Sequence, residues 1–143
     1  MKAWDTSFVI RHLTEDDPKQ LKIARGELAK SERRGEAIWI SLVVVIETAW
    51  VLSQYDLNKA QTLEVIQALA DDSRFQVEDA HILRNAIERA QIKGALPEHV
   101  AALVGKAKGV TKTQTFDKSV KSFSEFEILP YEKDIEPQPF SSL

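Results

Sequence analysis

Four acidic residues occupy positions where a carboxylate could take part in chemistry. Asp5 directly follows the short apolar segment 2–4, and Asp117 follows the β-branched segment 111–116 in the same way. Glu47 lies in a stretch that is apolar on nearly every side, and Glu98 follows a proline. Because an ionised carboxylate in apolar surroundings needs a cation or hydrogen-bond donors to replace its water, we take Asp5, Glu47, Glu98 and Asp117 as candidate metal ligands.

Each of these acids also has a structural explanation that the sequence leaves open. Asp5 and Asp117 are suitable helix N-caps, since their side chains can accept hydrogen bonds from the first turn. Glu98 would be favoured by the helix dipole at the start of any helix. Glu47 could form an ion pair with an arginine such as Arg11.

The order of the expected elements predicts the fold class. Short strand-like segments alternate with helical ones, and helix-start signals stand at Asp5, Asp16-Asp17-Pro18, Ser41, Asn58, Asp79 and Pro97. Strands are expected at 2–4, 37–40, 75–77, 111–116 and 126–129. This alternation is typical of a three-layer α/β/α domain with a mainly parallel central sheet.

Such a sheet would bring the acids together. The carboxyl ends of parallel strands and the adjoining helix starts meet at one crevice, where several carboxylates would repel one another unless a cation neutralised them. The chain contains no cysteine, which excludes disulfides, thiolate zinc sites and cysteine nucleophiles. Oxygen ligands without a paired histidine motif favour Mg²⁺ or Mn²⁺, an ion that can activate water for phosphodiester hydrolysis.

The bulk properties are those of one globular domain. The chain has 143 residues, of which 43% are hydrophobic and 29% are charged. We expect a domain over residues 1–130 and a loosely ordered tail over 131–143, where prolines and serines gather. Neither a signal peptide nor a membrane-spanning segment is expected, which favours a cytoplasmic location.

A nucleic-acid substrate would require a local basic surface, because the net charge of −3 gives no general attraction. Five lysines fall in a short window that contains one acid, Asp117; they are Lys106, Lys108, Lys112, Lys118 and Lys121. This window could bind phosphates or could be a solvated helix end and loop. Trp50 is expected in the core, and His99 at the surface.

Three segments resemble the VapC-type toxins of the PIN-domain family. Residues 5–13 resemble the family's opening Asp-Thr-Asn motif, with Ser7 in place of the usual asparagine. Residues 40–52 are similar to its central helix with one glutamate, and residues 115–118 match its late Thr-Phe-Asp segment. The order and spacing of these segments agree over residues 1–130.

The family's third acidic motif can be aligned in two registers. Counting back from Asp117 and matching Gly109 places Glu98 on the third acid and Ala95 on the other aspartate of that motif. Matching 102–104 to the family's Ala-Leu-Ile places Ala101 there and leaves no carboxylate. We prefer the first register, because Pro97 and Glu98 also begin a helix.

The resemblance implies a Mg²⁺- or Mn²⁺-dependent endoribonuclease, the toxin of a type II toxin–antitoxin pair, in which the four acids hold the ion. It further implies a homodimer, an RNA substrate and a cognate antitoxin. The alternative function is a catalytically weakened or inactive domain that binds an antitoxin or RNA. Supporting polar roles are expected for Thr6, Ser7 and Thr115, and RNA contacts for Arg11 and the five lysines.

Overall fold

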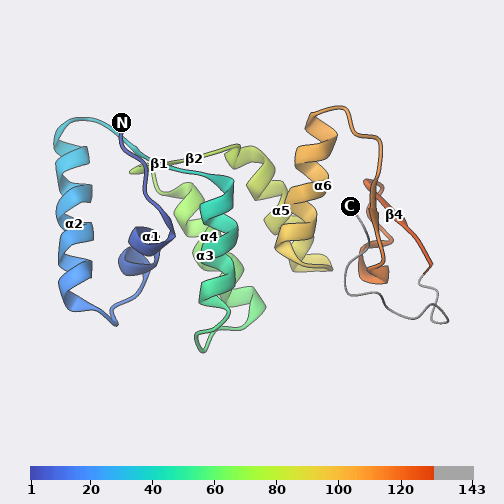
Figure 1. The fold of residues 1–143 in the computed structure, drawn as a ribbon, viewed down its shortest axis with the longest axis horizontal. Helices are drawn as coiled ribbons and strands as arrows, with labels where there is room; N and C mark the ends of the chain where they lie inside the picture. Colours follow the sequence, from blue (N-terminus) through green and yellow to red (C-terminus); the bar gives the residue numbers. More distant parts are fainter. Residues whose placement is uncertain (131–143) are drawn as a thin grey trace, which may run out of the picture.

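The computed structural model describes residues 1–130 as an alternation of helices and short strands (Figure 1). The helices are α1 (Thr6–Leu13), α2 (Pro18–Arg33), α3 (Leu42–Leu52), α4 (Lys59–Asp71), α5 (Ala80–Ile92) and α6 (Leu96–Ala107), with a 3-10 turn η1 (Lys118–Val120). The strands are β1 (Ile38–Ile40), β2 (Phe75–Val77), β3 (Thr113–Thr115) and β4 (Phe126–Ile128). The expected tail, residues 131–143, lies outside the described residues.

Local capping chemistry sets most helix starts where the sequence predicts them. The Asp5 carboxylate accepts a hydrogen bond from the Phe8 N–H at 3.2 Å and so caps α1. Ser41 caps α3, and Asn58 forms a reciprocal capping box with Gln61 at the start of α4. The prediction for Asp79 is wrong in detail: it precedes α5 in a left-handed conformation, and its side chain accepts no capping bond.

All strand pairs in the described residues are parallel, which confirms the α/β/α class with a mainly parallel sheet. β1 pairs with β2 on one side, and on the other side a bridge between Ala3 and Trp39 adds the segment 2–4 as a third strand. β3 and β4 pair with each other in a second, separate sheet. The strands are therefore divided between two sheets.

Two apolar cores correspond to these two sheets. The larger core gathers fully buried side chains of α1, β1, α3, α4 and α5, among them Val9, Ile40 and Leu83. The smaller core consists of Ala102, Val120 and Phe126, with partly buried aliphatic and aromatic neighbours. Helix α6 contributes to both, since its Leu96, Val100 and Leu103 belong to the larger core. Figure 1 shows α5 and α6 between the N-terminal sheet and the β3–β4 sheet.

Gly94, which joins α5 to α6, has a conformation and surroundings that only glycine suits. Its φ is +84°, and an added Cβ would lie 2.6 Å from a methyl carbon of Val120 and 2.8 Å from Nε2 of His99. The turn thus brings the backbone against the small core.

We expect Gly94→Ala to lower the free energy of unfolding by about 2–4 kcal/mol, because backbone strain and a steric clash add. Gly35→Ala is the matched control, since Gly35 also has a positive φ of +67° but no heavy atom near its Cβ position. The control should lose only about 1 kcal/mol. Urea denaturation of the three proteins measures the difference, and equal losses would contradict the proposed clash.

Candidate metal-binding site

Asp5 lies at the carboxyl end of the segment 2–4, as predicted. Its Oδ1 accepts hydrogen bonds from the Ser7 hydroxyl at 2.6 Å and from the Phe8 N–H at 3.2 Å. The Ser7 hydroxyl and the Phe8 N–H lower the pKa of Asp5, so this exposed carboxylate is ionised. Thr6 is the first residue of α1 and is half-buried. Ser7 therefore orients Asp5, and Asp5 combines capping with the capacity to bind a cation.

Glu47 lies at the surface, although its sequence neighbours are apolar. Helix α3 buries Leu42, Val45, Thr48 and Leu52 and leaves the opposite face open. Val43, Glu47 and Trp50 share that open face at helical spacing, and Val43 and Trp50 are each 67% exposed. The prediction that Trp50 belongs to the core is therefore wrong, because α3 is covered on one side only.

Arg11 is not the partner of Glu47. Its guanidinium binds Asp16 at 2.6 Å and Gln20 at 2.8 Å, which fixes α1 against the start of α2. Asp16 also accepts bonds from the hydroxyls of Thr14 and Tyr55, and the pKa of its carboxyl is lowered to about 2 by these three groups. The structural ion pair considered for Glu47 is thus contradicted.

Glu98 and Asp117 meet, although 18 residues separate them in the sequence. Glu98 stands in the first turn of α6, and Asp117 follows β3 and caps η1 by accepting a bond from the Ser119 N–H at 2.8 Å. The Thr115 hydroxyl accepts a bond from the Asp117 N–H at 3.1 Å, so this predicted supporting residue holds the turn. The two carboxyl groups are close enough for each to shift the pKa of the other.

The electrostatics of the pair are unequal. Burial, together with the neighbouring Asp117, raises the pKa of Glu98. The hydroxyl and N–H of Ser119, together with Glu98, lower the pKa of Asp117. The Oε2 atom of Glu98 is buried and has no hydrogen-bond partner in residues 1–130. A shared proton or a bound cation would satisfy that oxygen.

The four acids do not form one site in a single copy. Over residues 1–130, no group of three or more aspartate, glutamate or histidine side chains is placed to hold one metal ion. Asp5 begins α1 and Glu98 begins α6, and Figure 1 shows α3 and α4 between these two helices. The donor chemistry of the Glu98–Asp117 pair suits a hard cation, but the complete predicted ligand set does not fit one ion in this arrangement.

The predicted phosphate-binding lysines lie on the C-terminal part of the chain. Lys108, Lys118 and Lys121 are exposed. Lys106 instead lies 3.5 Å from the Glu125 carboxylate, and the Lys112 ammonium donates to the Ser124 carbonyl at 2.5 Å. Three of the five lysines thus remain candidates for phosphate contacts on geometric grounds.

The prediction that His99 lies at the surface is wrong. The imidazole is fully buried and packs edge-on against the rings of Phe123 and Phe126. Its Nε2 is 2.7 Å from the Lys93 carbonyl oxygen, a contact that ties the α5–α6 turn to the small core. His99 follows Glu98 directly, so this packing also fixes the first turn of α6 beside Asp117. In the sequence, the only feature that points to this packing role of His99 is that it directly follows Glu98, a candidate ligand.

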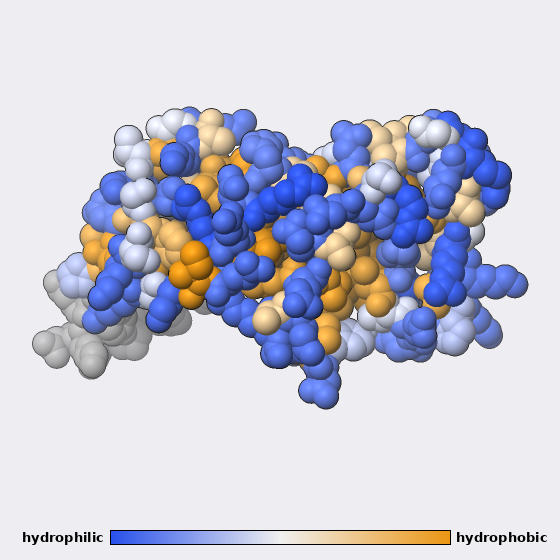
Figure 2. All heavy atoms as spheres, turned by 180° about the vertical axis from the view of Figure 1, so that it is seen from behind, coloured by the Kyte–Doolittle hydropathy of each residue, from blue (hydrophilic) through white to orange (hydrophobic). Residues whose placement is uncertain are grey.

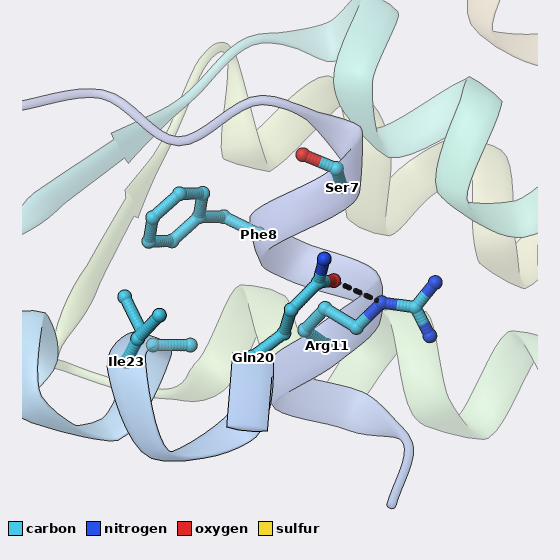
Figure 3. A pocket seen from close by; sticks show the side chains of 6 residues that line it. Ser7, Phe8, Arg11, Gln20 and Ile23 are labelled. Carbon is cyan, nitrogen blue, oxygen red and sulfur yellow. Dashed lines mark hydrogen bonds between the residues drawn. The ribbon is translucent and has the colours of Figure 1, made fainter. Parts of the chain in front are cut away.

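A pocket adjoins the Asp5 region between α1 and α2 (Figure 3). Figure 3 shows Phe8 and Ile23 from the two helices facing the same space, with the Gln20–Arg11 hydrogen bond at one end. Ser7, the partner of Asp5, also lines it. The pocket therefore offers apolar contacts next to the guanidinium of Arg11 and the hydroxyl of Ser7, which donates to the Asp5 carboxylate.

A second groove runs beside the open face of α3. It is lined by residues of α3, α4 and the start of α6, including Trp50, Leu63 and Pro97. Its lining is mostly apolar, and it reaches the turn that precedes Glu98. No helix within residues 1–130 is both long enough and apolar enough to cross a membrane.

Comparison with known proteins gives one match. The family described as "PIN domain" matches residues 3–126. This region contains all four predicted acids and every element from α1 to the beginning of β4. No curated protein and no solved structure matches the chain significantly.

Proposed function

Since the chain belongs to the PIN-domain family, we propose that it is a metal-dependent endoribonuclease and the toxin of a type II toxin–antitoxin pair. The PIN domain is a nuclease-type fold, and its members typically use divalent metal ions. The Glu98–Asp117 pair carries this proposal. A partly buried carboxyl with an unsatisfied oxygen beside a second carboxylate is an arrangement that cation binding would stabilise.

The chain's own residues would perform three tasks. As the resemblance implies, Asp5, Glu47, Glu98 and Asp117 would hold Mg²⁺ or Mn²⁺, directly or through water. Of these, Glu98 and Asp117 lie together, no third acid joins them within residues 1–130 of one copy, and Asp5 and Glu47 would have to approach them. Such an ion would supply a hydroxide for phosphodiester hydrolysis. Ser7 and Thr115 hold Asp5 and Asp117 in position through short-range hydrogen bonds. Lys118 and Lys121, which follow Asp117 along η1, would bind phosphates beside it without reading sequence, and Lys108, at the other end of α6 from Glu98, would bind them farther away.

The toxin role is supported by the likeness of 5–13, 40–52 and 115–118 to VapC motifs. A cytoplasmic location and a cognate antitoxin are part of this proposal. The apolar pocket between α1 and α2 and the groove beside Trp50 are surfaces where an antitoxin segment could bind.

Asp5→Asn should abolish the cleavage of a structured, end-labelled RNA, with a loss of at least about a hundred-fold, because one charged ligand is removed while the cap on α1 is retained. The assay compares both proteins with Mn²⁺, with Mg²⁺ and with chelator. Asp56→Asn, at another exposed acid, is the control and should cleave like the parent. Equal cleavage by the parent and Asp5→Asn would contradict the role of Asp5.

Expression of the parent in bacteria should arrest growth, and Asp5→Asn should relieve the arrest at equal protein level. Colony counts after induction measure this effect. Arrest by both variants would contradict a toxin that acts through cleavage.

The absence of a complete ligand set from residues 1–130 of a single copy favours a second candidate, an inactive domain that binds RNA or an antitoxin. This candidate predicts that the protein retains a labelled RNA on a filter but leaves it intact at millimolar Mn²⁺. The cleavage assay above separates the two functions.

A further inference from the structure

The exposed side of α2 carries a row of positively charged side chains. The helix buries Leu21, Ala24 and Leu28 on its other side. Six exposed residues at helical spacing form what we call the α2 outer face: Lys19, Lys22, Ile23, Gly26, Lys30 and Arg33. From its first lysine to its arginine this face is about 21 Å long, because an α-helix rises about 1.5 Å per residue.

The positive charge of this face is concentrated and mostly unpaired. Residues 18–34 contain six lysines and arginines and two glutamates, whereas the whole chain has a net charge of −3. Lys30 forms an ion pair with Glu27 at 2.9 Å. Within residues 1–130, no carboxylate forms an ion pair with the other three cations of the face. These three cations are therefore available to an anionic ligand.

The α2 outer face points away from the rest of the molecule. Figure 1 shows α2 at one end, followed by α1, then by α3 and α4, with α6 and β4 towards the other end. In Figure 2, the end that lies opposite the grey residues, where α2 is, is mostly hydrophilic. The face thus lies on the other side of the central helices from the Glu98–Asp117 pair and from the lysines beside it.

Gly26, in the middle of this face, is not required by the packing of the fold. It lies inside α2 without a positive φ, and an added Cβ would have no heavy atom within 4 Å. Glycine inside an exposed helix is destabilising relative to other residues, because it loses more backbone freedom on folding. The lack of a side chain lets a ligand approach the helix closely. Gly26 therefore suits contact with a chain that runs along the row of cations.

The residue types of the face favour a phosphate backbone over a protein or a lipid surface. Lysine is depleted from protein–protein interfaces, whereas lysine and arginine provide the contacts that neutralise nucleic-acid phosphates. Binding to a membrane surface would require an exposed apolar face, and the apolar side of α2 is buried against α1. A straight row of cations suits a single strand that can extend along it, and a helix does not fit the deep, narrow major groove of duplex RNA.

We propose that the α2 outer face binds the sugar–phosphate backbone of single-stranded RNA, which comes closest to the helix at Gly26. The face anchors the strand without reading its sequence, while another part of the same strand reaches Glu98 and Asp117. The choice of RNA as the nucleic acid rests on the function proposed above. The binding itself requires neither a metal ion nor cleavage.

Salt-dependent binding of a fluorescein-labelled oligouridylate, measured in chelator, tests the anchor without cleavage. For a single strand, the slope of log K against log salt falls by about 0.7 for each phosphate neutralised, so Lys19→Gln/Lys22→Gln should make the slope shallower by about 1.4 and weaken binding roughly tenfold at about 0.1 M salt. Glutamine favours helix, so α2 should persist.

The matched control is Arg84→Gln/Lys93→Gln. It removes two exposed positive charges at α5 and its end, on the other side of the central helices. The control should bind the oligouridylate with the affinity and the salt slope of the parent. Equal losses in the two double variants, or no loss in Lys19→Gln/Lys22→Gln, would overturn the proposal.

Gly26→Gln tests the close approach of the strand. The substitution should raise the urea midpoint, since glutamine is a better helix former than glycine. It should also weaken oligouridylate binding, because the new side chain holds the strand away from the helix. A loss of folding cannot produce this combination. Unchanged binding by Gly26→Gln would contradict the contact at that residue.

A polyglutamate competitor distinguishes a surface for nucleic acid from a surface for an acidic protein segment. Unlabelled oligouridylate should displace the labelled strand at a lower concentration of charges than polyglutamate does. Equal displacement at equal charge would show that the face does not prefer a phosphate backbone, and the proposal would be wrong.

Cleavage kinetics separate this proposal from the nuclease function. If the parent cleaves RNA, Lys19→Gln/Lys22→Gln should raise KM more than it lowers kcat, as expected when binding away from the reacting bond is lost. RNA binding that depends on α2, with no cleavage by the parent, would refute the nuclease function and keep the anchor. Cleavage by the parent with RNA binding that does not depend on α2 would refute the anchor and keep the nuclease function.

Discussion

Asp117→Asn is expected to lower RNA cleavage by at least about a hundred-fold while leaving the fold intact. The substitution removes the ionised member of the Glu98–Asp117 pair, the carboxylate best suited to bind a cation. Asparagine can still accept the capping bond from the Ser119 N–H, so η1 and the small core should persist. Cleavage rates at fixed Mn²⁺, together with the urea midpoint, measure both effects.

Glu98→Gln is the informative companion to that variant. If Glu98 is a ligand, cleavage should fall at least about tenfold, because the amide is neutral and binds cations weakly. If Glu98 serves only to support Asp117, glutamine can donate to the Asp117 carboxylate and cleavage should stay near the parent level. Unchanged cleavage would favour the alignment that leaves no carboxylate in the third motif.

Arg89→Ala is expected to cost about 3 kcal/mol of unfolding free energy at pH 7. Glu125 is 6% exposed, and its main partner is the Arg89 guanidinium of α5, with Lys106 of α6 nearby. Removing Arg89 leaves a buried carboxylate without its main counter-charge and also removes a guanidinium stacked over Phe123 at 5.6 Å. Urea denaturation at pH 7 measures the loss.

The same ion pair should make stability fall in acid. Arg89 is the main reason that the pKa of Glu125 is lowered from 4.5 to about 2. Since the pKa is lower in the folded state than in the unfolded state, the stabilisation is complete above about pH 4.5 and is lost as the pH falls towards 2. Arg89→Ala should therefore show a smaller decrease in stability between pH 5 and pH 3 than the parent.

An exposed pair provides the control for both measurements. Lys30→Ala removes an ion pair with Glu27 on the surface of α2 and should change stability by less than about 0.5 kcal/mol. A loss in Arg89→Ala no greater than in this control would show that the Glu125 pair contributes little to joining α5 and α6 to the β3–β4 sheet.

The sequence by itself determined the elements and most of their ends. Asp5, Ser41 and Asn58 cap their helices where the sequence predicts, because a cap depends on residues within one turn. Alternation of short strands with helices predicted the α/β class, since a parallel pair requires a crossover between its strands. The resemblance to the family identified the four acids by alignment, and their roles as metal ligands remain predictions.

Tertiary structure alone decided the surroundings of the candidate residues. Glu47 and Trp50 are exposed because α3 is covered on one face, and His99 is buried because the Gly94 turn folds α6 against the small core. No local pattern encodes which surface a helix meets.

Strand pairing is the same kind of long-range choice. The packing of α6 against β3 brings Glu98 to Asp117, and strand pairing divides the strands between two sheets, leaving Asp5 away from that pair. Sequence spacing places both aspartates at strand ends, but which strand edges pair depends on contacts between distant segments. The four acids were therefore predictable as residues, whereas their assembly into one site depends on how the sheet edges pair.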